Sequence, residues 1–180
     1  FQDVTDNSVV YVDTLKYDYA HVDMKVEPVK DDWINMANDI GMTQVKSSKY
    51  VSTHLKAKGS VRSLQIVAEK DQAATFTFNT ELAVLNGSLP ALPSMTKGTV
   101  HGYFYFADQA PKASLQLAND QWKASKEADF IFESLGDGWY YGSIPVTLLQ
   151  GYEAGNGDKI IRIMLKIPAG YSVYIDGFMY

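Results

Sequence analysis

The sequence predicts an all-β fold, an antiparallel β-sandwich of the jelly-roll type with one short helix. Short segments alternate apolar with polar residues, turn signals separate these segments, and a single stretch has helical spacing. Alternation with a period of two places one face of each strand in a core and the other toward solvent. About ten such segments in one chain are typical of a sandwich.

The C-terminal stretch 159–180 has the clearest strand pattern. Apolar residues alternate from 161 to 167, and a Pro-Ala-Gly turn at 168–170 separates them from a second alternating segment at 171–176. We expect these two strands to form a buried two-stranded ribbon. Because an isolated ribbon is barely stable in water, strands from earlier in the chain should pair with it.

The same patterns predict the other elements. Asp137-Gly138 indicates a hairpin turn, and 86–97 is predicted to be a loop because it lacks periodicity. Residues 31–40 form the predicted helix, since apolar residues recur at i, i+3, i+4 and i+7 between an aspartate N-cap and a glycine stop. The further predicted strands are 9–13, 20–27, 49–57, 61–69, 72–80, 99–107, 113–117, 129–133 and 139–146.

Composition limits the classes of partner. The chain has 180 residues, 46% of them apolar, which suits a single domain spanning 1–180. A net charge of −5 without long Lys/Arg runs argues against a nucleic-acid partner. No apolar run reaches the ~18 residues of a membrane span, and the lack of cysteine excludes disulfides and thiolate sites. Because the chain opens on Phe1 without a signal-peptide pattern, we expect it to be part of a longer protein.

The strand 99–107 carries the first candidate binding residues. Its inner positions are apolar or glycine, whereas His101, Tyr103 and Tyr105 share the other face. One interpretation is a second, partly covered core layer. The other is an aromatic platform, on which the C–H faces of sugar rings can stack while nearby polar groups bind their hydroxyls.

Four more residues complete the candidate ligand site. Alternation puts Trp139 and Tyr141 on the same side of their strand, where Trp139 is either a core anchor or a stacking platform. Trp122 lies among polar residues, and an exposed tryptophan there points to ligand stacking or to a cover over one mouth of the sandwich. Arg162 is expected to project onto the same face as Tyr103, to bind uronic-acid carboxylates or to form a routine ion pair.

Metal and catalytic motifs are sparse. The histidines lack zinc-site spacing, but Asp176 lies in an otherwise apolar strand, where a buried carboxylate needs either a cation such as calcium or several hydrogen-bond donors. Nucleophile-elbow, P-loop and dinucleotide-binding motifs are missing from the sequence. A lyase needs a base and an acid beside the sugar ring, and His101 and Tyr103, two positions apart on one strand face, have a suitable arrangement. A glycosidase pair of carboxylates stays open because its spacing is spatial.

The order of elements over 137–180 resembles the jelly-roll, galactose-binding-like carbohydrate-binding modules of bacterial glycoside hydrolases and polysaccharide lyases. The resemblance rests on a tryptophan after Asp137-Gly138, an Ile-Pro pair, an apolar strand and the sequence Tyr-Ile-Asp-Gly ending at Gly177. It implies a structural calcium involving Asp176 and a glycan site on a sheet face or at the loop tips. Gln65-Ile66-Val67 lacks the histidine of jelly-roll alginate lyases.

We therefore expect a non-catalytic carbohydrate-binding module. It should bind a polysaccharide or oligosaccharide by aromatic stacking and polar contacts, and direct a covalently linked catalytic domain to its substrate. The resemblance implies a secreted or cell-surface location in a bacterium. The alternatives are a small polysaccharide lyase or glycoside hydrolase, and an adhesion sandwich that binds a protein.

Overall fold

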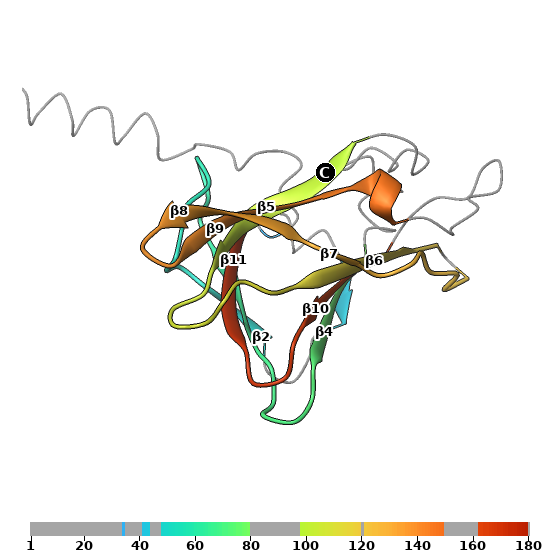
Figure 1. The fold of residues 1–180 in the computed structure, drawn as a ribbon, viewed down its shortest axis with the longest axis horizontal. Helices are drawn as coiled ribbons and strands as arrows, with labels where there is room; N and C mark the ends of the chain where they lie inside the picture. The colour runs from blue at the N-terminus through green and yellow to red at the C-terminus, as the bar shows by residue number, and fades with distance from the viewer. Residues whose placement is uncertain are drawn as a thin grey trace, which may run out of the picture.

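The computed structural model describes residues 34, 41–43, 48–79, 98–119, 121–149 and 162–179. They form two sheets with antiparallel neighbours (Figure 1). The five-stranded sheet has the order β1 (Gly41–Thr43), β4 (Ala74–Asn79), β10 (Arg162–Ile167), β6 (Ser114–Ala118), β7 (Ala128–Asp129). The six-stranded sheet has the order β2 (Ser48–Val51), β3 (Ser63–Val67), β11 (Ser172–Met179), β5 (Thr99–Tyr105), β9 (Trp139–Pro145), β8 (Ile131–Gly136).

The inner faces of the two sheets share one apolar core. In β10 every second residue is fully buried, and in β5 the burial alternates along the whole strand. Burying one such side chain contributes roughly 1.5–3 kcal/mol, so this alternation defines the sandwich. The largest fully buried side chains are Phe76, Phe78, Phe104, Phe106, Phe178, Ile34, Leu64, Ile66, Leu115 and Ile144.

The predicted fold class is confirmed, and the structure supplies most strands where alternation predicts them. Asp137-Gly138 forms the turn between the paired strands β8 and β9, as expected. A short 3₁₀ helix, Val146–Leu148, follows β9. The predictions for 9–13, 20–27 and 86–97 lie outside the described residues, as does the predicted helix 31–40 except for Ile34. Among the described residues, no helix has the length and apolar character that crossing a bilayer requires.

Three strand predictions are wrong in detail. The expected C-terminal ribbon does not form, because β10 and β11 belong to different sheets and their connecting turn joins the two layers (Figure 1). The segment 129–133 is split at the buried Phe130 into β7 and β8, which also lie in different sheets. The strand predicted for 49–57 ends at Val51. The residues after it turn onto the outer face of the sheet, where His54 stacks on Tyr174.

A β-bulge interrupts β11 beside β5. The register between these strands shifts between Asp176 and Met179, and Gly177 has φ +58°. A Cβ at Gly177 would lie 2.5 Å from the Cβ of Ala57, so only glycine fits beneath the β2–β3 loop. The extra residue lets Phe178 point into the core although Asp176, two positions earlier, lies on the outer side.

Two glycines make room for the phenylalanines of the core. Gly102 in β5 and Gly142 in β9 are register partners. The ring of Phe104 packs near the rings of Phe130 and Phe132, with centroids 4.9 and 5.2 Å away. A Cβ on Gly142 would come within 2.7 Å of ring carbons of both Phe104 and Phe132.

Gly142→Ala is therefore expected to lower the free energy of unfolding by about 1–3 kcal/mol, because the added methyl overpacks rigid aromatic rings. Chemical denaturation of the variant and the wild type measures this difference. Ser143→Ala is the matched control, since the next side chain in β9 is half-exposed on the outer face. Equal stability of Gly142→Ala and wild type would show that the ring cluster adapts freely.

Candidate functional site

The outer face of the six-stranded sheet carries a group of half-buried aromatic side chains. Tyr105 of β5 lies in register between Tyr174 of β11 and Trp139 of β9, and Tyr103 lies opposite Tyr141. Alternation turns these residues away from the core while their neighbours point into it. We call the following set the aromatic face: His54, His101, Tyr103, Tyr105, Trp139, Tyr141 and Tyr174.

The rings of the aromatic face touch one another. Ring centroids are 6.1 Å apart for Tyr105 and Tyr174, and 5.4 Å apart for Tyr105 and Trp139. On the neighbouring positions, Tyr141 lies 5.7 Å from Tyr103 and 5.6 Å from His101. These separations are typical of interacting aromatic pairs. The rings form two groups of contacting side chains at neighbouring register positions of three central strands. One group is His54, Tyr105, Trp139 and Tyr174, and the other is His101, Tyr103 and Tyr141.

The loop between β2 and β3 lies across one side of this surface. The imidazole of His54 stacks on the ring of Tyr174 at 3.7 Å and 14°, and the Lys56 ammonium lies 5.9 Å from the centroid of Trp139. Gln65 of β3 donates a hydrogen bond of 2.9 Å to the Tyr174 hydroxyl. Polar groups that can bind hydroxyls therefore border the rings.

Asp176 anchors this loop. The side chain is fully buried, its Oδ2 accepts the backbone N–H groups of Lys56 and Ala57, the latter at 2.6 Å, and its Oδ1 accepts the Ser60 hydroxyl. Hydrogen bonds to a charged acceptor are among the stronger ones in proteins. The carboxylate is thus stabilised by several donors, one of the two possibilities that the sequence left open.

The residues around Asp176 do not fit a calcium ion. Calcium takes six to eight oxygen ligands, whereas both oxygens of this carboxylate face N–H or O–H donors. Within the described ranges, no three His, Asp or Glu side chains gather as a metal site would require. The structural calcium that the resemblance implies is a prediction that the calcium-chelator experiment below tests.

Trp122 and Arg162 lie apart from the aromatic face. Both belong to the five-stranded layer, where the Arg162 guanidinium stacks on the Trp122 ring at 4.2 Å and donates to the Asn119 carbonyl. The expectation that Arg162 shares a face with Tyr103 is therefore wrong. Trp122 is 58% exposed and has φ +61°, an unusual conformation for a bulky residue.

Two titratable groups on the aromatic face have shifted pKa values. Burial lowers the pKa of His101 below 6.5, so its imidazole is neutral at pH 7. Burial, and then the neighbouring Tyr103 and Glu133, raise the pKa of Tyr141, so its phenol keeps its proton. Both side chains are then uncharged hydrogen-bonding groups at neutral pH.

A pocket of about 290 Å³ adjoins the aromatic face at Tyr105 and Tyr174. Its other walls come from the β5–β6 loop and the β10–β11 turn.

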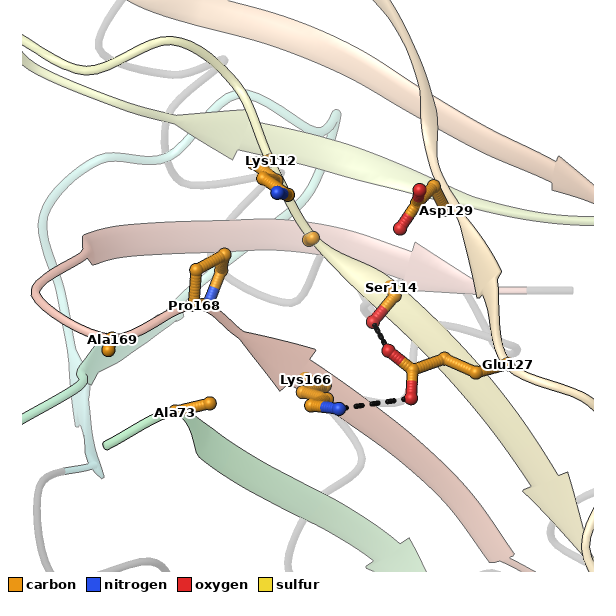
Figure 2. Close-up of a pocket in the computed structure, with 9 residues that line it drawn as sticks. Ala73, Lys112, Ser114, Glu127, Asp129, Lys166, Pro168 and Ala169 are labelled. Atoms are coloured by element: carbon orange, nitrogen blue, oxygen red, sulfur yellow. Dashed lines mark hydrogen bonds and ion pairs between the residues drawn. The ribbon is translucent and has the colours of Figure 1, made fainter. Parts of the chain in front are cut away.

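A larger cavity of about 390 Å³ lies against the five-stranded sheet, as Figure 2 shows. There Glu127 accepts hydrogen bonds from Ser114 at 2.5 Å and Lys166 at 3.1 Å, and these partners hold its pKa below the usual range. The lining residues of that cavity include no aromatic side chain.

The structure brings together four of the predicted ligand-binding residues, Tyr103, Tyr105, Trp139 and Tyr141, and separates Trp122 and Arg162 from them. Sequence reasoning missed His54, Lys56, Gln65 and Tyr174 as parts of this surface. The sequence signal that could have identified Tyr174 is alternation, which places it opposite to Val173 and Ile175 and so outside the core. Its register with Tyr105 is known only from the structure. His54 and Lys56 reach the face only through the path of the β2–β3 loop.

No family model matches the chain, and no curated protein matches it. Similar solved structures include the enzymatically active domain of tailspike protein 4 of bacteriophage CBA120, at 11% identity and TM-score 0.50, over 82% of this chain and 20% of that one. The CBM22-2 xylan-binding domain of Paenibacillus barcinonensis Xyn10C is similar at 16% identity and TM-score 0.45, over 83% of this chain and 95% of that one. The structure of TmCBM61 in complex with β-1,4-galactotriose is similar at 15% identity and TM-score 0.44, over 78% of this chain and 84% of that one.

Several of these similar structures are carbohydrate-binding modules, the class that the sequence resembles. At 11% identity and a TM-score of 0.50, the likeness to the tailspike domain extends to the fold alone. The function of this chain must therefore be argued from its own surface.

Replacing Asp176 tests the anchor. Asp176→Asn is expected to lower the free energy of unfolding by about 1–3 kcal/mol, because a neutral amide replaces the charged acceptor of the two backbone N–H groups and puts an NH2 group where the carboxylate accepts the Ser60 hydroxyl. Thermal or urea unfolding measures the loss, with the exposed Asp129→Asn as a control. The loss should be the same with and without a calcium chelator. A loss that disappears in the chelator would identify Asp176 as a metal ligand.

The lowered pKa of His101 predicts a pH dependence of stability. In the unfolded chain the His101 imidazole binds a proton near pH 6.5, whereas in the folded chain it binds one only at lower pH. The free energy of unfolding therefore has its full His101 contribution above pH 6.5 and loses it as the pH falls through the lower pKa of the folded chain. Acidification from about pH 8 to about pH 5 should lower the melting temperature of the wild type more than that of His101→Gln. Equal decreases in the melting temperatures of the wild type and His101→Gln would contradict the lowered pKa of His101.

Proposed function

We propose that the protein is a non-catalytic carbohydrate-binding module that binds a polysaccharide on the aromatic face. The observation that carries the proposal is the presence of two neighbouring groups of contacting rings on the outer face of the six-stranded sheet. A sheet face that only needed to be solvated would carry charged or small polar side chains. Instead, large rings are held half-exposed with polar groups beside them.

The chemistry of this surface matches that of sugars. The C–H groups of a pyranose ring present an apolar patch that can lie on Trp139 or Tyr105, and its hydroxyls need donors and acceptors within hydrogen-bonding distance. Gln65, Lys56 and the tyrosine hydroxyls provide these groups. Because the rings sit on strands and contact one another, little conformational entropy is lost when a ligand binds.

Two variants test the site. Trp139→Ala and Tyr105→Ala are each expected to weaken oligosaccharide binding by about 1–3 kcal/mol, roughly 5- to 150-fold in Kd, because each removes a stacking surface. Isothermal titration calorimetry against a panel of galactan, xylan, mannan and glucan fragments measures the change. Leu148→Ala removes an exposed apolar side chain at the other end of β9 and is the control.

The same mixtures distinguish the competing hypotheses. Binding without released oligosaccharide supports a binding module, whereas product formation that disappears in His101→Ala would establish an enzyme. Failure of the wild type to bind any glycan of the panel would favour a sandwich with a protein partner. Normal binding by both Trp139→Ala and Tyr105→Ala would remove the aromatic face as the site.

We also propose Trp122 as a second contact for long chains. Its indole is exposed, rigidified by Arg162 and held in an unusual backbone conformation, a combination found more often at functional positions. Two contacts on one polymer raise its apparent affinity. Trp122→Ala should therefore bind short oligosaccharides as the wild type does and be retarded less on polysaccharide gels. Equal retardation would exclude this contact.

The proposed role is to direct a covalently linked catalytic domain to its polysaccharide, outside a bacterial cell or on its surface. This role and location are those that the resemblance over 137–180 implies. In the full-length protein, Trp139→Ala should lower activity on polymeric substrate and leave activity on small soluble substrate unchanged. Equal loss on both substrates would contradict a targeting role.

A further inference from the structure

We infer that the pocket beside the aromatic face binds one uncharged sugar residue, with Asp108 as the group that selects neutral glycans over uronic-acid glycans. This inference rests on the proposed function. The pocket is lined by Tyr105 of β5, by Ser172 and Tyr174 of β11, and by Asp108 and Gln109 of the β5–β6 loop. Ala107 and Gly170 complete the wall.

The pocket has the size and composition of a sugar subsite. Its volume of about 290 Å³ lies at the lower end of the range for small-molecule sites. Two half-buried tyrosine rings supply the apolar surface, and they are also central members of the aromatic face. A glycan stacked on Trp139 and Tyr105 therefore reaches the pocket without leaving the surface.

Gln109 holds the two sides of the pocket in place. Its Nε2 donates to the Gly170 carbonyl at 3.1 Å, and its Oε1 accepts the Ser172 N–H at 3.1 Å. The β10–β11 turn is fixed further by the hydrogen bond of 2.7 Å from the Gly170 N–H to the Glu69 carbonyl. The β5–β6 loop and the turn are thus bound together before any ligand arrives, which favours tight binding.

Asp108 supplies the selectivity. Its side chain is exposed in the pocket, and within the described part of the chain it makes no hydrogen bond or ion pair. A carboxylate accepts two strong hydrogen bonds from neighbouring hydroxyls of a sugar ring. The same charge repels the carboxylate of a uronic acid placed in the pocket. Arg162, which could have balanced that charge, lies in the other sheet.

The test compares neutral with uronic-acid oligosaccharides of equal length, by calorimetry, on the wild type and two variants. Asp108→Asn keeps the shape and removes the charge, so affinity for the neutral ligand should fall by roughly tenfold, and preference over the uronic ligand should shrink. Gln109→Ala should lower neutral-ligand affinity by loosening the walls. Asp129→Asn, an equal charge change on the other sheet, is the control.

The outcomes separate this inference from the proposed function. Loss of binding in Trp139→Ala together with wild-type affinities in Asp108→Asn would overturn the pocket assignment and leave the binding module standing. A wild type that prefers the uronic ligand would also overturn it. Normal binding in Trp139→Ala and Tyr105→Ala would overturn both. Reduced neutral affinity and reduced discrimination in Asp108→Asn would establish the subsite.

Discussion

A single buried carboxylate fixes the segment that crosses the aromatic face. Asp176 accepts two backbone N–H groups and a hydroxyl from residues 56–60, which lie more than 100 positions earlier in the chain. Without these acceptors the loop would leave buried N–H groups unsatisfied, at a cost of about 1–3 kcal/mol for each group. His54 and Lys56 are placed over Tyr174 and Trp139 because this loop is held down at its centre. The shape of the aromatic face therefore depends on an interaction that is buried beneath the loop.

The two sheets share a core but differ in their outer faces. The six-stranded sheet presents contacting rings, whereas the five-stranded sheet presents charged groups such as Glu127 and Lys166, which pair with each other (Figure 2). The core requires only that one face of each strand be apolar. The other face is free to differ, and among the described residues the six-stranded sheet carries the groups of contacting aromatic rings on it.

Periodicity predicts which side of a strand a residue occupies, and it fails where assignment to a sheet matters. The inward and outward positions of β5, and the opposite directions of Tyr140 and Tyr141, follow from alternation alone. The prediction that Arg162 shares a face with Tyr103 is wrong because β10 and β11 show the same alternation. A period of two does not tell whether a tight turn connects two strands of different sheets or two neighbouring strands of one sheet. His54 could not be predicted, since its position depends on hydrogen bonds from residues 56–60 to a carboxylate far away in sequence.

The position of β11 has a consequence for folding. This strand is the last described in the chain, yet it lies between β3 and β5 near the middle of the six-stranded sheet and carries both Tyr174 and Asp176. Its pairings are non-local, and contacts of this kind close large loops and form slowly. During synthesis, β2 to β9 emerge before the strand that completes their sheet. The aromatic face is therefore assembled late, in the same step that completes the six-stranded sheet.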